Sequence, residues 1–150
     1  MSSRPHDVLH VGHLFRIPFQ SVSGEILAGL AAAGFGDVRP AHLVVFQHVR
    51  REGSRLVELA RLAQITPQAM GYLVDQLAER GYVERIPDPD DRRAVLVRLT
   101  GRGWDEVACA LATIADLERE WEEVLGAAAY AQLKDSLGAL CAHLATRGYV

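Results

Sequence analysis

The chain has 150 residues, of which 49% are hydrophobic, and this is enough for one compact domain with a core of ordinary size. It contains no apolar run long enough to cross a bilayer and no signal pattern at its start, so we expect a cytoplasmic protein without a membrane partner. Its net charge of −3 is unfavourable for a protein that binds phosphates. The two cysteines, Cys109 and Cys141, show no spacing typical of a disulfide framework or a zinc site, and we expect both to be inert core residues.

The first predicted element is a long amphipathic helix over residues 6–33, where apolar residues recur at helical spacing. Pro18 lies inside this segment, and proline removes a backbone hydrogen bond and clashes with the preceding turn. We therefore expect a kink or a break near Ile17. After a loop, Pro40 is placed to open a second helix that carries apolar residues up to Val49.

Two short helices joined by a tight turn are predicted next. The first covers residues 56–63, and the second runs from Thr66 to Arg80. Thr66 is a good N-cap, Pro67 suits the first helical position, and Gly81 is placed to end the helix. This arrangement is typical of a helix-turn-helix motif.

A β-hairpin with a charged tip follows. Residues 82–86 and 94–99 are rich in β-branched side chains, and residues 87–93 between them hold two prolines and five charged residues. Thr100 is then expected to cap a long helix, and a last helix completes the chain. Both late helices carry apolar stripes with the spacing of helices that pack against long partners.

These elements predict a mainly α fold with a small β-hairpin wing, in a single domain of residues 1–150. Residues 40–103 are expected to form a winged helix-turn-helix lobe, and residues 1–39 and 104–150 a helical dimerisation lobe. Charge follows the same division, since residues 50–103 hold ten arginines against eight acids and the rest of the chain has a net charge of −5. Arginine suits phosphates and base edges, although a coding bias towards arginine explains the composition equally well.

Short motifs in the helix-turn-helix and the hairpin are more specific. The upstream motifs are PAH from Pro40, LA from Leu59, ITPQAM from Ile65, LVDQL from Leu73 and RGYV from Arg80; the hairpin has DPDDRR from Asp88 and RLTGRG from Arg98. Together they resemble the recognition segment and wing of the MarR family, and the resemblance covers residues 14–103. It implies a homodimeric regulator that binds duplex DNA through a winged helix-turn-helix and acts as a ligand-responsive repressor.

The resemblance implies that the helix from Thr66 to Arg80 lies in the major groove. Its expected DNA-binding residues are Thr66, Pro67, Gln68, Gly71, Tyr72 and Gln76. Gln68 is the candidate for base reading because its amide can form a bidentate pair with adenine, and a solvated helix face is the alternative. Relatives often carry Ser or Thr in place of Gly71 and Arg in place of Tyr72 and Gln76, so this chain departs from the family there.

The resemblance also implies roles for the wing. Arg93 matches the arginine that enters the minor groove, where a narrow groove concentrates negative potential, and Asp91 matches the acid that holds its guanidinium. Arg92 is expected to contact phosphate. Arg55, at the start of the first short helix, is either a further phosphate contact or a surface charge. A solvated charged loop is the alternative for the whole wing.

A pocket between the two lobes, which admits a small aromatic or anionic effector, is a further implication of the resemblance. Arg16 is the candidate partner for a ligand carboxylate, with an ion pair to a partner subunit as the alternative, and His13 and His42 are further pocket candidates. His6, His10 and His13 share one helical face, but no nearby cysteine or set of carboxylates completes a ligand set. We therefore expect neither a metal site nor a cofactor.

We considered three alternatives to a ligand-responsive DNA-binding repressor. The first is a winged-helix module that binds protein instead of DNA, and the second is a metal-responsive regulator. The third is an enzyme, but the sequence has no G-x-S-x-G, H-E-x-x-H or P-loop motif, so it offers no nucleophile, metal base or phosphate cradle.

Overall fold

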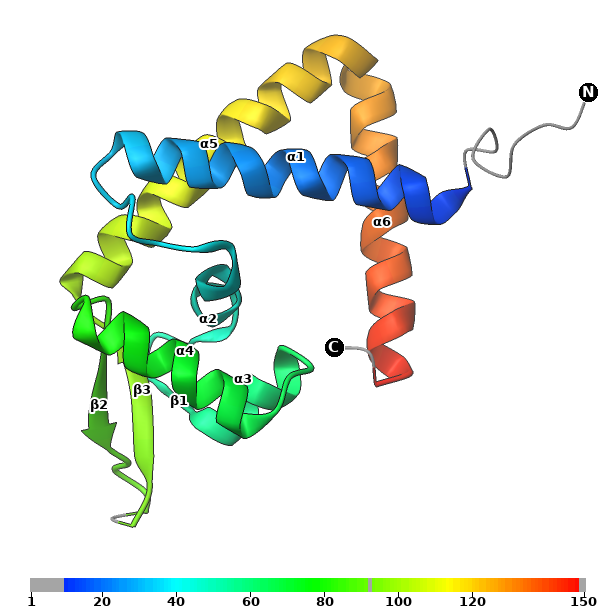
Figure 1. Cartoon of the computed structure of the whole chain (residues 1–150). Coiled ribbons are helices and arrows are strands. Elements are labelled where there is room, and N and C mark those ends of the chain that lie inside the picture. Colours follow the sequence, from blue (N-terminus) through cyan, green and yellow to red (C-terminus); the bar gives the residue numbers. More distant parts are fainter. Residues whose placement is uncertain (1–9, 92, 149–150) are drawn as a thin grey trace, which may run out of the picture.

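A computed structural model describes residues 10–91 and 93–148 of the chain. Three long helices frame one part of the molecule, and short helices with a small sheet form the other (Figure 1). The elements in chain order are α1 (Val11–Ala32), the 3-10 helix η1 (Pro40–His42), α2 (Leu43–His48), β1 (Ser54–Arg55), α3 (Leu56–Leu62), α4 (Pro67–Glu79), β2 (Val83–Pro87), β3 (Val95–Leu99), α5 (Gly101–Leu125) and α6 (Ala127–Thr146). This confirms the predicted fold class, a mainly α protein with a small winged helix-turn-helix sheet.

The sheet has three antiparallel strands in the order β1-β3-β2. The hairpin pairs Val83 with Leu99 at its base and Pro87 with Val95 near its tip, as the sequence predicts. β1 was not expected, because a strand of two residues has no alternation to reveal it. Gly53, with a φ of 106°, turns the chain into this strand, and a Cβ there would lie 3.1 Å from the Cβ of Leu96.

The core lies between α2, α3, α4 and the inner face of the sheet. On α4 the buried residues Met70, Val74 and Leu77 follow helical spacing, so the opposite face of that helix is free. Alternate residues of β3, Val97 and Leu99, are buried against them. Side chains from the second half of α1 extend this core towards α5.

Gly103 allows α5 to pack closely against the hairpin. It is buried in the first turn of α5, and a Cβ at this position would collide with the backbone oxygen of Tyr82. Thr100 caps the helix as predicted, because its Oγ1 accepts a hydrogen bond of 3.2 Å from the backbone N–H of Gly103. The close approach of the two backbones therefore requires glycine.

α1 runs unbroken through Pro18, so the predicted break near Ile17 is wrong (Figure 1). Proline removes one backbone hydrogen bond, but the helical turns on either side of Pro18 keep their own hydrogen bonds, so the helix continues. Its second half also packs along α5, which anchors it through buried Ile26 and Leu30. The first four residues of the predicted helix, 6–9, lie outside the described residues.

Apolar side chains of the long helices remain uncovered. The most exposed are Val124 at 78%, Phe19 at 67% and Val11 at 63%. Cys141 on α6 is also exposed, so the expectation that it is a core residue is wrong for the single chain, whereas Cys109 is half-buried beside α1. No helix within the described part of the chain is long and apolar enough to cross a membrane.

Candidate nucleic-acid interface

The first turns of α4 present an exposed polar face. Thr66 caps the helix, since its Oγ1 accepts a hydrogen bond of 3.1 Å from the backbone N–H of Ala69. Pro67 and Gln68 are exposed beside it, and Tyr72 is 64% exposed one turn further on. The structure therefore brings together four of the residues that the sequence analysis singled out on this helix.

Gly71 lies on the same helix but is half-buried. A Cβ at Gly71 would meet only the Cδ1 of Leu56, at an ordinary contact distance of 3.8 Å. The backbone at this position therefore has room for a small side chain such as that of alanine. Glycine here leaves a shallow step in the surface between Gln68 and Tyr72.

The side chains of Gln76 and His42, two residues that the sequence analysis singled out, are hydrogen-bonded to each other. The backbone N–H of Arg39 donates to Nδ1 of His42 at 3.0 Å, so Nε2 carries the proton of the neutral ring and donates to Oε1 of Gln76 at 2.7 Å. His42 is only 1% exposed and lines neither of the cavities described below. This hydrogen bond joins η1 to α4.

Arg55 forms an ion pair at the base of the wing. Its Nε and Nη2 donate to the same carboxylate oxygen of Asp88, at 2.9 and 2.7 Å. Asp88 is buried, and its other carboxylate oxygen accepts the backbone N–H of Asp90 at 2.9 Å. These two interactions, that from Asp90 first and then that from Arg55, lower the pKa of the Asp88 carboxyl.

The sequence analysis expected Asp91 to hold the guanidinium of Arg93. In the structure Asp91 instead binds the backbone of Arg93. Its Oδ1 accepts the backbone N–H of Arg93 at 3.0 Å, and its Oδ2 lies 3.7 Å from Nη2 of Arg55. The Arg93 side chain is exposed and makes no ion pair within residues 10–91 and 93–148. The wing therefore presents a free cation on a backbone fixed by two acids. Arg92 lies outside the described residues.

Acids neutralise much of the basic charge of residues 50–103. Five of its arginines form ion pairs in the described part of the chain: Arg50 with Glu58, Arg55 with Asp88, Arg85 with Asp75, Arg98 with Glu84 and Arg102 with Asp37. Arg51 lies over the ring of Trp104, at 5.7 Å from its centroid. Few cations of the described residues are thus free to meet phosphate, and the exposed Arg93 lies at the tip of the wing.

The N-terminal ligand candidates do not converge on a pocket. Arg16 donates to the Gln20 side chain at 3.0 Å on the exposed surface of α1, and His13 pairs with His10 at 2.9 Å. Neither Arg16 nor His13 lines either of the two cavities next to the long helices. Between residues 10 and 148, leaving Arg92 aside, no group of three potential metal ligands lies together, and His6 falls outside the described residues.

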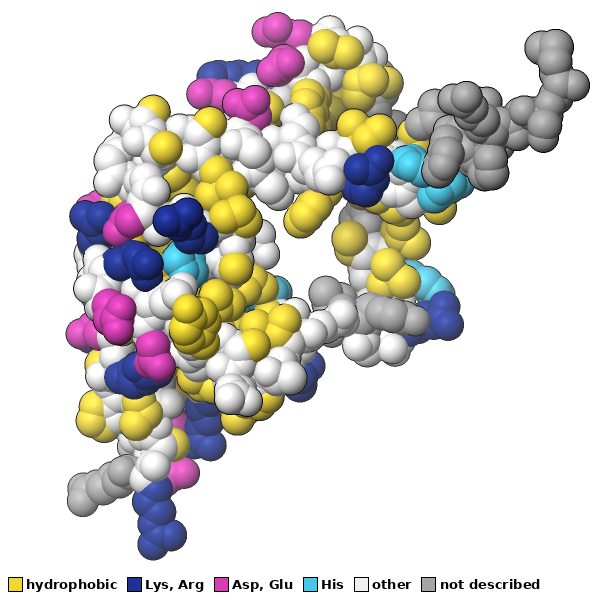
Figure 2. Space-filling model, viewed as in Figure 1, with side chains coloured by type: hydrophobic (Ala, Val, Ile, Leu, Met, Phe, Trp, Pro, Cys, Tyr) yellow, Lys and Arg dark blue, Asp and Glu magenta, His cyan; other side chains and the backbone are white. Residues whose placement is uncertain are grey.

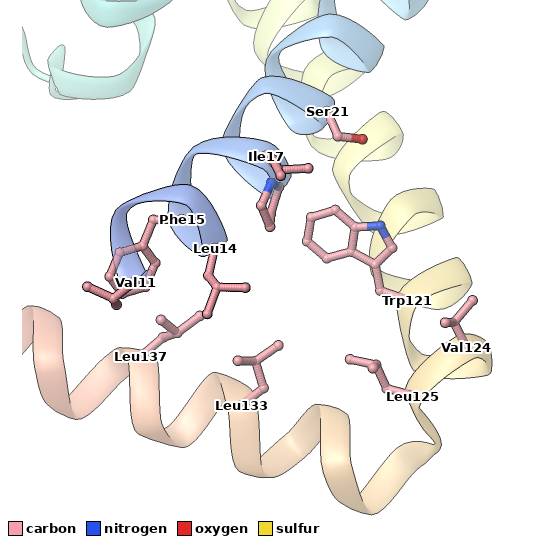
Figure 3. A pocket seen from close by; sticks show the side chains of 11 residues that line it. Val11, Leu14, Phe15, Ile17, Ser21, Trp121, Val124, Leu125, Leu133 and Leu137 are labelled. Carbon is pink, nitrogen blue, oxygen red and sulfur yellow. The ribbon is translucent and has the colours of Figure 1, made fainter. Parts of the chain in front are cut away.

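Two cavities lie next to the long helices. An apolar groove of about 650 Å³ separates the first half of α1 from α6 and the end of α5, and Figure 3 shows Leu14, Trp121 and Leu133 around it. A smaller cavity of about 140 Å³ lies between α1, α2 and α5, with Glu106 in its wall. Glu106 is fully buried, and neither of its carboxylate oxygens has a hydrogen-bond partner among the described residues. Burial raises its pKa to about 7.

Known proteins resemble this chain in sequence. A model described as the MarR family matches residues 37–94. The chain is 29% identical to the HTH-type transcriptional repressor MdtR of Bacillus subtilis over 86 residues, which are 57% of this chain and 54% of MdtR. It is 43% identical to the multiple antibiotic resistance protein MarR of Escherichia coli over 47 residues, 31% of this chain and 33% of MarR. The matched segments thus span between a third and about half of these relatives.

Solved structures match nearly the whole chain. A mutant of MarR from E. coli in complex with operator DNA has a TM-score of 0.71 and 27% identity, covering 93% of this chain and 99% of that one. Over nearly its whole length the chain is thus similar in fold to a MarR family regulator, and its middle part is similar in sequence as well. A MarR family protein of Mycobacterium tuberculosis in complex with salicylic acid has a TM-score of 0.66 and 26% identity, over 90% of this chain and 98% of that one.

Sequence analysis missed two residues of the site and its surroundings. Asp88 was read as part of the charged tip, because its partner Arg55 is 33 residues away and no local spacing connects them. Glu106 was not singled out at all. Glu106 is next to Val107 on the apolar stripe of α5. A carboxyl at the edge of an apolar stripe is the sequence feature that could have indicated a buried acid.

Proposed function

We propose that this protein is a transcription repressor that binds duplex DNA as a homodimer. The observation that carries the proposal is the exposed polar face at the start of α4 beside a wing with a free Arg93. The match to a MarR structure in complex with operator DNA supports the same role. The relationship to the repressor MdtR favours a regulator over an enzyme. A DNA target requires the protein to work in the cytoplasm.

In the proposed complex α4 lies in the major groove. Gln68 reads an adenine with its side-chain amide, and Tyr72 donates its hydroxyl to phosphate or packs its ring on a thymine methyl. Thr66 and Pro67 bring the start of the helix, with its positive dipole end, towards the phosphate backbone. Arg93 enters the adjacent minor groove from the wing.

A second copy of the chain is the proposed occupant of the apolar groove beside α1. The groove is lined by aliphatic and aromatic side chains, and several of them are half-exposed or more in the single chain. Exposed apolar patches of this kind mark interaction sites, and a self-complementary contact between two such faces gives a dimer with two-fold symmetry. Two α4 helices related by this symmetry would then read two half-sites.

An effector is part of the proposal. The M. tuberculosis relative was solved in complex with salicylic acid, and this chain has a cavity of about 140 Å³ between α1, α2 and α5. These helices connect the helix-turn-helix to the helices of the proposed dimer. A ligand bound between them would change the separation of the two α4 helices and lower the affinity for DNA.

The proposal is tested by the binding of the full chain to duplex DNA from its own promoter region. We expect sequence-specific binding, and Gln68→Ala should lose about 1 to 3 kcal/mol and relax base preference at one position of each half-site. Gln132→Ala on exposed α6 is the matched control and should bind as the wild type does. A uniform loss across all sequences would remove Gln68 as a reader, and an absence of DNA binding would favour a protein-interaction module.

A further inference from the structure

Glu106 is a buried carboxyl with no partner. Its side chain is 0% exposed, and both of its oxygens lack a hydrogen bond among the described residues. Buried polar groups in folded proteins almost always have a partner, because an unpaired one loses its hydration and gains nothing in return. A carboxyl that is kept in this environment therefore calls for a partner that the single chain does not supply.

The cavity beside Glu106 has the size of a small organic molecule. It has a volume of about 140 Å³, and apolar cavities of about 150 Å³ are known to hold one benzene molecule. Its remaining walls are apolar side chains from α1, α2 and α5, apart from the amide of Gln47. Gln47 and Leu111 are exposed at its edge, so a ligand has access from solvent.

The chemistry of the wall favours a cation. An ionised Glu106 is stabilised most by a positive charge that enters the same low-dielectric space, and the ring of Phe46 in the same wall adds cation–π attraction. An anion would instead place a second negative charge beside an unpaired carboxyl. Arg16, the residue expected to receive an anionic effector, does not line this cavity.

No other titratable side chain of the described residues lines this cavity. The titratable residues next to lining residues along these helices are Glu25 on α1, His48 on α2, and Asp105 and Cys109 on α5, and all four lie outside the lining. Burial alone raises the pKa of Glu106 to about 7, so its ionised form is available at neutral and alkaline pH.

We propose that the cavity between α1, α2 and α5 binds a small apolar amine, with the ammonium group paired to Glu106 and the hydrocarbon body against the apolar wall. This names the effector class and rests on the proposed function for its regulatory meaning. The binding itself does not depend on DNA. Occupation would bridge α2 of the helix-turn-helix to α1 and α5 of the helical frame.

The test uses the full chain at pH 8 and three probes of nearly equal shape: benzylammonium, neutral benzyl alcohol and anionic benzoate. Calorimetric titration is expected to show benzylammonium binding at least fivefold tighter than benzyl alcohol and no binding of benzoate. Glu106→Gln should abolish this fivefold preference and keep the weak binding of benzyl alcohol. Asp105→Asn removes an exposed negative charge next to Glu106 and should leave all three affinities unchanged.

A second measurement uses only the wild-type chain, in case Glu106→Gln does not fold. The affinity for benzylammonium should rise about tenfold from pH 6 to pH 8, because Glu106 loses its proton while the amine keeps its own. Equal binding of the alcohol and the ammonium, binding of benzoate, or no binding of any probe would each overturn the proposal. DNA binding is measured separately, so an amine-binding protein that ignores DNA would overturn the proposed function and leave this site standing.

Discussion

At the scale of single residues, Glu106 makes stability depend on pH. Its pKa is about 7 in the folded chain against 4.5 for an ordinary glutamate, so between these values the folded state holds a proton that the unfolded state has released. Stability is therefore highest below about pH 4.5 with respect to this group, falls as the pH rises, and levels off above about pH 7. The full loss corresponds to about 3 kcal/mol.

Glu106→Gln should remove this dependence. We expect the variant to be more stable than the wild type at pH 8, by up to about 3 kcal/mol, and to lose most of that advantage at pH 5. Urea unfolding at the two pH values measures the difference. An advantage of equal size at both pH values would mean that packing, and not ionisation, separates the two side chains.

Gly103 gives a second prediction at this scale. Because a Cβ at Gly103 would collide with the backbone oxygen of Tyr82, Gly103→Ala must push α5 away from the hairpin and should cost about 1 to 3 kcal/mol. Gly101→Ala, in the same turn with nothing near its Cβ position, is the control and should change stability little. Thermal unfolding compares the two, and equal effects would contradict the close approach described here.

At the scale of elements, the wing depends on a contact between β1 and the hairpin tip. Arg55 and Asp88 join these segments, and Asp91 faces the same guanidinium. If Arg55 acts by positioning the wing, Arg55→Ala and Asp88→Ala should each weaken DNA binding, and their losses should overlap in a double-mutant cycle. Because Arg55 then touches no phosphate, the slope of log affinity against log salt should stay as in the wild type.

Arg93→Ala, also in the wing, is compared with Arg55→Ala and Asp88→Ala. Its guanidinium is free, so its loss should lower the salt slope by about one phosphate contact and weaken binding to AT-rich flanks most. Affinity measured over a salt series for all four variants, the double mutant included, separates the two roles. If the losses of DNA affinity from Arg55→Ala and Asp88→Ala were additive and Arg55→Ala also lowered the salt slope, Arg55 would be a direct phosphate contact.

At the scale of the whole molecule, charge and apolar surface are divided between the two parts. Figure 2 shows acidic side chains gathered near the junction of α5 and α6 and most of the Lys and Arg side chains over the other part. The apolar groove is lined by residues of α1, α5 and α6, and none of its lining residues belongs to α4 or to the hairpin. A dimer built through the groove would thus leave the proposed DNA-binding faces open.

The proposed dimer predicts a monomer when the groove is made charged. Val124→Asp and Leu133→Asp place a carboxylate on its apolar walls, where it would be buried without a partner in a dimer. Val57→Asp on α3 is the control, since Val57 is 62% exposed and lies outside the groove. Sedimentation velocity should show a dimer for the wild type and for the control, and monomers for the groove variants; dimers throughout would exclude the groove as the interface.

Much of the fold was predictable because the signals are local. Thr66 and Thr100 cap their helices through backbone groups three residues away, Gly81 ends α4 with a φ of 76°, and the hairpin is marked by its alternating strands. The exposed face of α4 followed from the spacing of its buried residues. These features depend on neighbours within one or two turns, and no tertiary contact is needed to specify them.

The sequence by itself determined the order of the main helices, the β-hairpin, the resemblance to the MarR family and the residues on the face of α4. Only the tertiary structure decided which polar side chains are free, because the partners of Arg55 and His42 lie 33 and 34 residues away along the chain. It also decided that Glu106 is buried unpaired, since three helices must meet around it. Pairing and desolvation depend on distances through space, and spacing along a single chain does not contain them.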